Sequence, residues 1–518
     1  MAYPYVKLAA GIALAAGAFA ATAAARPPER LEIILRPLSV HQTIRGFGAS
    51  DAWSVQFVGK SWPLEKRERV ADLLFSLEER PDGSPVGIGL SLWRFDVGAG
   101  STPQGAASNI RDRWRRTESF LRPDGGYDWS RKAGQRWFLR AAKERGVEHF
   151  TAFSNSPPVA FTRNGRANSS GGDSTNLAAD RYEDFAGYLT RVVAHLQESE
   201  GVHFDFVSPV NEPQWDWKDG QEGSPWRNAE IARVTRALAR SLEEAGLDTK
   251  VKIGEAGKLT YLYERADRPR RGDQLAAFFE RSSPLYLGDL PNVARGLSGH
   301  SYWTTYPADT LVAVRARVRA RLEHVDPGLE FWQTEYCLLE NNPRVRGAGR
   351  PEGMDAALYA ARVLHADLTV ADASVWNWWL AVSPYDFKDG LVYVDRDTLD
   401  GTVSPSKLLW ALGHYSRFVR PGMERISVSR SDSAAAAPGR RDVLVSAFTD
   451  PARGRSVAVV VNTGADEVRM SFAGAGARRL GRYLTTAQRG DDLRFLGWIP
   501  AGREIRLPPR SMMTVVFD

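Results

Sequence analysis

Short, almost continuously hydrophobic runs alternate with longer amphipathic segments over most of the chain. The hydrophobic runs cover residues 46–50, 89–97, 149–155, 204–211, 251–255, 297–303, 331–337 and 374–379. Segments of helical periodicity follow them, at residues 64–77, 132–145, 180–197, 229–245, 274–281, 308–323, 354–371 and 406–419. Apolar strands that alternate with helices are typical of a parallel sheet buried on both faces, and eight such units can close into a barrel. We therefore predict an α/β fold with a (β/α)8 TIM barrel over residues 41–420, the alternative being a doubly wound open sheet.

Residues 421–518 follow another pattern, in which short β-rich runs are separated by turn sequences such as Gly490-Asp491-Asp492. This pattern predicts an antiparallel β-sandwich side domain. A β-rich run at Leu31–Leu35, within residues 26–40, precedes the barrel and has no helix of its own. We expect this N-terminal strand to join the C-terminal sandwich, so that both ends of the mature chain belong to one domain.

The first 25 residues carry the features of a secretory signal peptide. Lys7 precedes an apolar run over residues 8–20, and the small residues Ala23-Ala24-Ala25 form an A-x-A cleavage site. The alternative is a membrane anchor, but the run is shorter than the ~20 residues that span a bilayer. We predict an exported protein, periplasmic or extracellular, with no membrane span after cleavage.

Composition narrows the class further. The 518 residues are 43% hydrophobic and 25% charged, which is typical of a soluble globular protein. Cys337 is the single cysteine, so no intramolecular disulfide can form, and we expect a buried thiol. The net charge of +6 comes from arginines spread among acidic residues, which argues against nucleic-acid binding. Phosphate-binding and metal-binding motifs are absent from the sequence, so we expect no cofactor and no metal. We also expect a monomer.

Two glutamates close two of the predicted barrel strands. The fourth strand ends in Val210-Asn211-Glu212-Pro213 and the seventh in Gln333-Thr334-Glu335-Tyr336. Active sites of barrels lie at the C-terminal ends of the strands, so Glu212 and Glu335 should face each other across the barrel mouth. Two carboxylates on either side of one bond are what glycoside hydrolysis requires. The alternative is that both are helix N-caps or salt-bridged loop residues.

Tryptophan supplies a second indication of a sugar substrate. The chain contains sixteen tryptophans, several of them beside polar residues near predicted strand ends, as in Trp376-Asn377-Trp378-Trp379. Indole faces stack on sugar rings as readily as on core residues. By itself this composition is also compatible with an aromatic core.

Several motifs resemble those of known glycosidases. Asn211-Glu212-Pro213 resembles the acid/base motif of clan A retaining glycosidases. Five further segments, in the same order along the chain, resemble glycoside hydrolase family 30: residues 46–50 (GFGAS), 154–158 (SNSPP), 299–302 (GHSY), 412–422 (LGHYSRFVRPG) and 507–511 (LPPRS). Within that family, residues 211–217 and 221–224 most resemble the branch that contains β-1,6-galactanases.

The resemblance implies a set of roles. Glu212 would be the general acid and base, Glu335 the nucleophile, and Asn211 the residue that holds the sugar 2-hydroxyl. From their positions near strand ends, Arg94, His300 and Tyr302 are expected to support the carboxylates, the alternatives being a core salt bridge, a hydrogen-bonded core histidine and a packed tyrosine. We expect substrate contacts from side chains in or next to strand-end loops, namely Asp51, Asn155, Trp215, Glu222, Trp376 and Trp378.

We therefore predict a secreted retaining hydrolase of β-linked galactan that cleaves β-1,6-galactosyl bonds by double displacement. β-1,6-Glucanase, glucosylceramidase-like and xylanase activities of the same family are alternatives. An alternative of another class is a carbohydrate-binding barrel protein that lacks catalysis.

Overall fold

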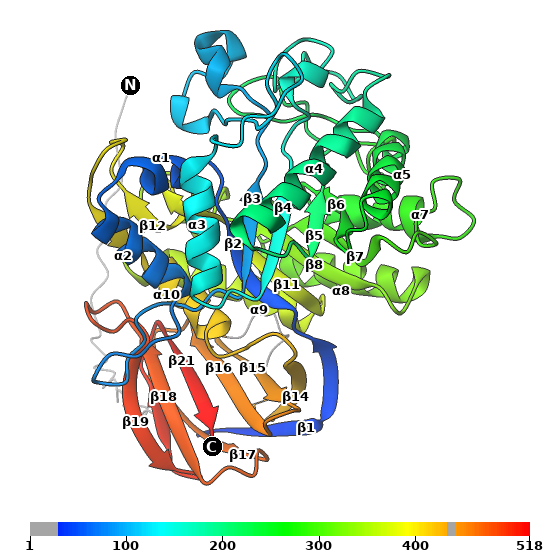
Figure 1. The fold of residues 1–518 in the computed structure, drawn as a ribbon. Coiled ribbons are helices and arrows are strands. Elements are labelled where there is room, and N and C mark those ends of the chain that lie inside the picture. Colours follow the sequence, from blue (N-terminus) through cyan, green and yellow to red (C-terminus); the bar gives the residue numbers. More distant parts are fainter. Residues whose placement is uncertain (1–29, 433–441) are drawn as a thin grey trace, which may run out of the picture.

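The computed structural model describes residues 30–432 and 442–518; the predicted signal peptide lies outside these residues. Eight parallel strands form the predicted barrel (Figure 1), and β11 closes it by pairing with both β8 and β2. In spatial order they are β2 (Gly46–Ser50), β3 (Leu92–Asp96), β4 (His149–Phe153), β5 (Phe206–Ser208), β6 (Lys250–Ala256), β7 (Val293–His300), β8 (Glu330–Tyr336) and β11 (Ala373–Ser383). The prediction of a TIM barrel is confirmed.

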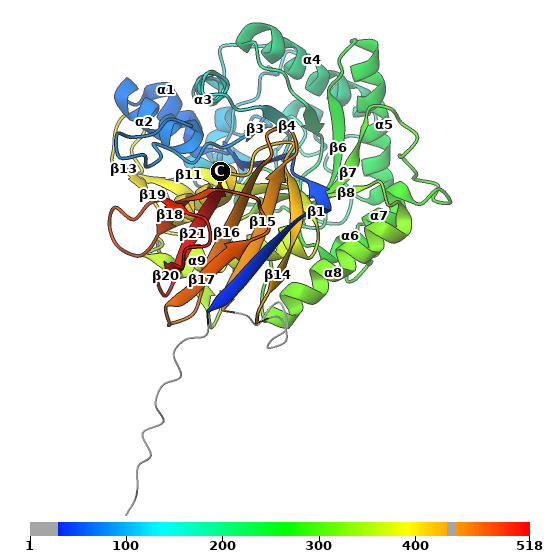
Figure 2. The ribbon, with the colours of Figure 1, turned by 90° about the horizontal axis from the view of Figure 1, so that it is seen from below.

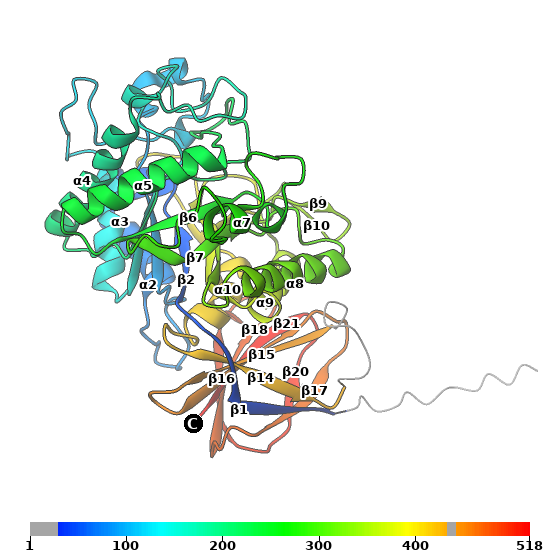
Figure 3. The same cartoon turned by 90° about the vertical axis from the view of Figure 1, so that its right-hand side faces the viewer.

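Helices surround this barrel, as the view from the side shows (Figure 3). Their apolar residues recur at helical spacing, as in the buried Ile231, Val234, Leu238 and Leu242 of α5. The helices are α1 (Ser54–Ser61), α2 (Leu64–Phe75), α3 (Ala133–Glu144), α4 (Tyr182–Glu200), α5 (Asn228–Glu244), α6 (Thr260–Tyr263), α7 (Gln274–Phe279), α8 (Ala308–Val325), α9 (Met354–Thr369) and α10 (Lys407–Ser416). Among the described residues, no helix combines the length and apolarity that crossing a bilayer requires.

The C-terminal domain is a nine-stranded sheet beneath the barrel (Figures 1 and 2). The N-terminal strand β1 (Leu31–Thr43) joins it as predicted, antiparallel to β14 and parallel to β17. The other strands are β14 (Glu424–Arg430), β15 (Val443–Asp450), β16 (Arg455–Asn462), β17 (Val468–Ala473), β18 (Arg479–Thr485), β19 (Arg494–Pro500), β20 (Ile505–Leu507) and β21 (Ser511–Phe517). The last two strands, β20 and β21, are separated by Pro508 and Pro509, which cannot donate a backbone hydrogen bond to the sheet.

Alternation along the strands gives the sheet two buried faces. In β16, Ala458 and Val460 pack with Leu31 and Ile33 of β1, inside the sheet domain. Their neighbours Val457, Val459 and Val461 belong instead to the hydrophobic core of the barrel. The two domains therefore share a core, which fixes the barrel on the sheet.

Replacement of Phe448 by alanine tests this shared core. Phe448 of β15 is fully buried in the barrel core and contacts Tyr415 of α10, with ring centroids 6.5 Å apart. We expect Phe448→Ala to lower the free energy of unfolding by about 3–5 kcal/mol, measured by urea denaturation, because a large apolar side chain leaves a cavity. Leu38→Ala is the control, since Leu38 is 99% exposed. Equal stability of the two variants would contradict the shared core.

Candidate active site

A cleft of about 510 Å³ opens at the C-terminal ends of the barrel strands. Glu212 follows β5 and Glu335 lies in β8, and both carboxylates line this cleft. Glu212 adopts a left-handed backbone conformation, with φ 42°, and its N–H donates to the carbonyl of Glu255, 2.9 Å away. A non-glycine residue with positive φ is uncommon, so the fold holds Glu212 in one orientation.

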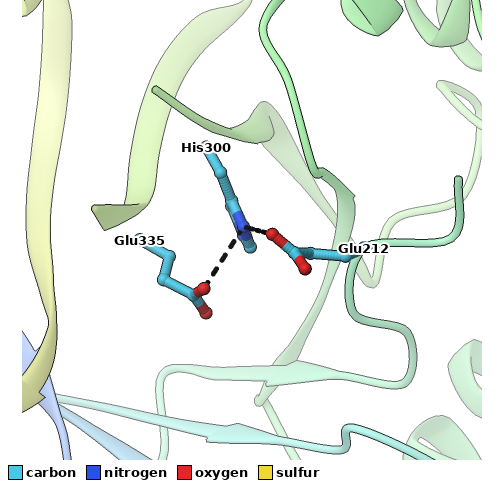
Figure 4. Close-up of side chains that lie close together, drawn as sticks. All are labelled: Glu212, His300 and Glu335. Carbon is cyan, nitrogen blue, oxygen red and sulfur yellow. Dashed lines mark hydrogen bonds and ion pairs between the residues drawn. The ribbon is translucent and has the colours of Figure 1, made fainter. Parts of the chain in front are cut away.

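His300, the last residue of β7, lies between the two carboxylates (Figure 4). Its Nδ1 is 2.9 Å from Oε1 of Glu212 and 3.5 Å from Oε1 of Glu335. One ligand atom from each of the three side chains lies within 4.8 Å of the others. The two strand-end glutamates therefore converge on one point, as the sequence predicts.

Two donors hold the carboxylate of Glu335. Arg94 Nη1 donates to Oε2 at 2.6 Å, and the Tyr302 hydroxyl donates to Oε1 at 3.0 Å. Both side chains are buried, and the pKa of Tyr302 is well above its ordinary value because of burial and the nearby charges. Tyr302 therefore stays protonated and can donate to an anion.

Arg94 also orders the residue before Glu212. Its Nη2 donates to Oδ1 of Asn211 at 2.8 Å, and its guanidinium lies 3.7 Å from the ring centroid of Phe153. This hydrogen bond occupies the carbonyl oxygen of Asn211, so the Asn211 side chain, which lines the cleft, can present its NH₂ group. The barrel core thus positions Asn211 and Glu335 through one arginine.

Glu255, in β6, is a site residue that the sequence analysis did not identify. Its Oε2 lies 3.0 Å from His300 Nε2 and accepts from Thr334 Oγ1 at 2.7 Å, and Lys252 Nζ lies 3.0 Å from Oε1. Burial opposes the charge on Glu255, yet Lys252, Arg94 and His300 keep its pKa well below the ordinary value. Glu255 closes the hydrophobic run 251–255, so the strand-end criterion that found Glu212 also points to it.

The charges of the site act on His300 and Glu212 in opposite directions. Burial disfavours the imidazolium, but Glu335, Glu212 and Glu255 outweigh it and raise the pKa of His300 to about 9. Burial raises the pKa of Glu212, and the charge of Glu335 adds to this effect, whereas His300 and Arg94 oppose it. At neutral pH, His300 is therefore a cation that donates a hydrogen bond to Glu212, whose own pKa is above its ordinary value.

The same three residues are the one group, among the described residues, whose ligand atoms lie close enough to hold a metal ion. A histidine ligand must offer a neutral ring nitrogen. Both ring nitrogens of His300 are hydrogen-bonded to carboxylates, and a pKa of about 9 keeps the ring protonated at neutral pH. The arrangement suits proton transfer better than metal binding.

Aromatic side chains form the walls of the cleft. Trp215, predicted to contact substrate, lines it together with Trp53, Trp217, Trp303 and Trp379. Trp215 and Trp303 meet edge to face, with ring centroids 5.4 Å apart, and Lys258 Nζ lies 5.4 Å from the Trp215 ring. Such a surface can stack against sugar rings.

The expectation that Trp376 and Trp378 face the cleft is corrected by the structure. Trp376 Nε1 donates to Asp367 of α9 and Trp378 Nε1 donates to the Asp389 carbonyl, and both indoles are buried outside the cleft. The residues of opposite parity in β11 point inward, and Trp379 reaches the cleft.

Three predicted contact residues, Asp51, Asn155 and Glu222, also lie outside the cleft. Glu222 accepts hydrogen bonds from the Ala99 and Ser101 N–H groups and from Ser101 Oγ, at 2.6–3.0 Å, and so fixes the loop after β3. Asp51 accepts from the Asp96 N–H and from Gln135, and Asn155 donates to Asp96. These side chains shape the strand-end loops from behind the cleft wall.

A family profile, two characterised enzymes and a crystal structure are similar to this chain. The sequence profile of O-glycosyl hydrolase family 30 matches residues 30–393. An endo-β-1,6-galactanase of Hypocrea rufa is 25% identical over 89% of this chain and 88% of its own length, and a glucuronoxylanase of Bacillus subtilis is 23% identical over 73% and 76%. A crystal structure described as a conserved exported protein from Bacteroides fragilis is 35% identical, with a TM-score of 0.87 over 93% of this chain and 99% of its own.

Proposed function

The chain belongs to O-glycosyl hydrolase family 30, and from this membership we propose that it is an exported, retaining hydrolase that cleaves β-1,6-galactosyl bonds of a galactan. The main support for this chemistry is that Glu212 and Glu335 converge on His300. One carboxylate oxygen of Glu212 lies within 4.8 Å of a carboxylate oxygen of Glu335. A separation of ~5–5.5 Å between the carboxyl groups is typical of retaining enzymes, whereas inverting enzymes need a wider gap for water.

In the first step, Glu335 would attack the anomeric carbon and form a glycosyl ester as the bond to the leaving oxygen breaks. Glu212 would give its proton to that oxygen. Oε1 of Glu212 accepts from His300, and within the described chain Oε2 has no hydrogen-bond partner, which leaves it free to hold the transferred proton.

In the second step, Glu212 would take a proton from water, and the water oxygen would displace Glu335 from the anomeric carbon. Once Glu335 is an ester, its negative charge no longer raises the pKa of Glu212. The pKa of Glu212 is then lower, so its carboxyl group holds a proton less tightly and can serve as the base. Two displacements at one carbon retain its configuration.

Galactan is proposed as the substrate because similarity to the Hypocrea rufa galactanase covers 89% of this chain. Similarity to the glucuronoxylanase covers 73% and makes xylan the second candidate. Sugar release from β-1,6-galactan, β-1,6-glucan and glucuronoxylan, measured in parallel at equal enzyme concentration, distinguishes them. We expect the highest rate of sugar release from galactan. Release from xylan or glucan without release from galactan would refute the galactan assignment.

Export is proposed from the signal-like sequence of residues 1–25 and from the similarity to a protein described as exported. Expression of the full chain in a bacterial host should give a mature protein outside the cytoplasm. Its N-terminal sequence should begin near Arg26. A full-length product retained in the cytoplasm would contradict export.

His300 should control the alkaline side of the pH profile. The His300 cation lowers the pKa of Glu212, so His300→Asn should raise that pKa and move the alkaline limb of kcat/KM to higher pH. We also expect kcat/KM at the optimum to fall on the order of 10²-fold, because Glu212 loses its positioning contact. An alkaline limb that stays in place, measured on an enzyme with unchanged circular dichroism, would show that His300 does not act on Glu212.

A further inference from the structure

The catalytic cleft and a second hollow share one lining side chain, Trp53. Trp53 lines the cleft, and it also lines a hollow of about 300 Å³ between the loops that follow β2, β3 and the short strand β12 (Gly390–Val394). Gln56, Phe57, Arg116 and Thr398 are among the other residues of that hollow, and none of them lines the cleft. The space along the barrel mouth is therefore divided at Trp53.

A stack of side chains extends this division. The Arg115 guanidinium lies 5.3 Å from the Trp53 ring centroid and 5.1 Å from that of Tyr385. The Arg396 guanidinium lies 5.4 Å from the Tyr385 ring centroid, and Arg396 Nη2 is 2.7 Å from Oδ1 of Asp112. We call Trp53, Arg115, Tyr385, Arg396 and Asp112 the end wall, since they bring together the loops that follow β2, β3, β11 and β12 at one end of the cleft.

The loops behind the end wall are tied to the barrel. Trp62 Nε1 donates to the Asp397 carbonyl at 3.0 Å, and Lys66 Nζ donates to the Gly401 carbonyl at 2.9 Å. Arg350 donates to the carbonyls of Tyr385 and Val394, at 3.1 and 2.9 Å. Trp53 itself is 4% exposed. The wall is thus anchored from both sides.

The opposite end of the cleft has another character. Trp215, Trp217, Gln221 and Trp303 line it, and Trp303 is 48% exposed. An exposed indole beside a cleft is a surface over which a longer chain can lie. One end of the cleft is closed by a wall, and the other is bounded by a solvent-exposed aromatic side chain.

Glu212 sets the direction of the substrate. Glu212 lies in the same loop after β5 as Trp215 and Trp217, and its backbone carbonyl accepts from Trp217 Nε1 at 3.0 Å and from Trp215 N–H at 3.2 Å. Glu335 lies in β8, which pairs with β11, the strand that leads to Tyr385 of the end wall. The proposed acid is therefore on the side of the exposed end. A general acid stands on the side of the leaving group. The leaving part of the substrate therefore lies over Trp215 and Trp303. The part of the substrate whose anomeric carbon is attacked lies against the end wall.

We propose that the end wall makes this enzyme act at the non-reducing end of its substrate and release short products of one length. This inference rests on the proposed roles of Glu212 and Glu335, because they fix the direction of the chain. It does not depend on the sugar, since the wall would stop any chain that extends beyond the cleft. Trp53, Arg115 and Tyr385 are then the residues that determine product length.

The test uses a long β-1,6-galacto-oligosaccharide labelled at its reducing end. The wild-type enzyme should shorten the labelled strand in equal steps and release one unlabelled product from the first time point. Labelled fragments of many lengths at the first time point would overturn the proposal. If galactan is not cleaved, the proposed substrate is wrong, but the proposed role of the end wall is still open to test. The same time course is then run on labelled β-1,6-glucan or xylan oligosaccharides, whichever the enzyme hydrolyses.

Opening the wall should change the pattern. Trp53→Ala combined with Tyr385→Ala removes the side chain that lines both the cleft and the second hollow, together with its neighbour in the wall, and we expect the ratio of internal to terminal cleavage to rise on the order of tenfold or more. Asp112→Ala, which frees Arg396, is a milder variant in case the double substitution prevents folding. Arg111→Ala is the matched control, because Arg111 lies on the same loop and lines neither space. An unchanged pattern in both folded wall variants would refute the role of the wall.

Discussion

Replacement of Glu335 by glutamine should lower kcat on galactan on the order of 10⁴–10⁶-fold, as expected when a catalytic nucleophile is lost. Glutamine keeps the size of the side chain and can still contact Arg94 and Tyr302, which lie 2.6 and 3.0 Å from the carboxylate oxygens. The amide cannot form the glycosyl ester. Rates measured at saturating substrate report this loss directly.

Glu330→Gln is the control for this experiment. Glu330 begins the same strand, β8, and its carboxylate binds Arg45, Trp332 and Ser374 away from the cleft. We expect this variant to retain most of its activity, and both variants should keep the circular dichroism of the wild type. Undiminished turnover of Glu335→Gln would remove Glu335 from the mechanism.

Replacement of Glu212 by glutamine should have an effect that depends on the leaving group. On galactan, whose leaving oxygen needs a proton, we expect kcat/KM to fall on the order of 10²–10⁴-fold. On an aryl β-galactoside with an acidic phenol, the leaving group departs without a proton, so the first step should be nearly unaffected. Hydrolysis of the ester is then slow, and a burst of phenol should precede a low steady rate.

Azide separates loss of the acid–base residue from general damage. Azide is already an anion, so it attacks the anomeric carbon without a base, breaks the ester bond to Glu335 and leaves that carboxylate free. With Glu212→Gln it should restore turnover of the aryl galactoside and give a β-galactosyl azide. It should not restore Glu335→Gln in the same way. Equal losses on both substrates, with no response to azide, would contradict the role of Glu212.

Much of the fold could be predicted because strands and helices differ in hydrophobic period. Each predicted barrel strand overlaps an observed one, and Leu31–Leu35 lies within β1. The convergence of Glu212, Glu335, Arg94, His300 and Tyr302 could be anticipated for one physical reason. The strands of a barrel are parallel, so residues at their C-terminal ends meet whatever their separation in sequence.

The cleft walls could not be predicted as well, because they depend on which face of a strand points inward. In β11, the register with β2 shifts between Trp378 and Leu380, and Trp379 rather than its neighbours reaches the cleft. A shift of one residue exchanges the two faces of a strand. The sequence of four residues Trp376-Asn377-Trp378-Trp379 carries an aromatic on both faces and does not specify the register.

Polar residues near the site raise a second difficulty. Glu222 and Asp51 follow strands or lie in strand-end loops, as substrate-binding residues do, but both accept hydrogen bonds from backbone N–H groups of the loop after β3 or its strand end. A buried carboxylate that orders a loop and one that binds a sugar have the same sequence signal. Their distinction rests on the distance to the cleft, which is a property of the folded chain.

The configuration of the first product tests the central proposal, double displacement by Glu335 and Glu212, most directly. Proton NMR can follow hydrolysis of a β-1,6-galacto-oligosaccharide and record the anomeric signal of the new reducing end before mutarotation. Two displacements predict that the β-anomer appears first and the α-anomer grows in later. An α-anomer at the earliest time would mean a single displacement by water and would contradict the mechanism proposed for this site.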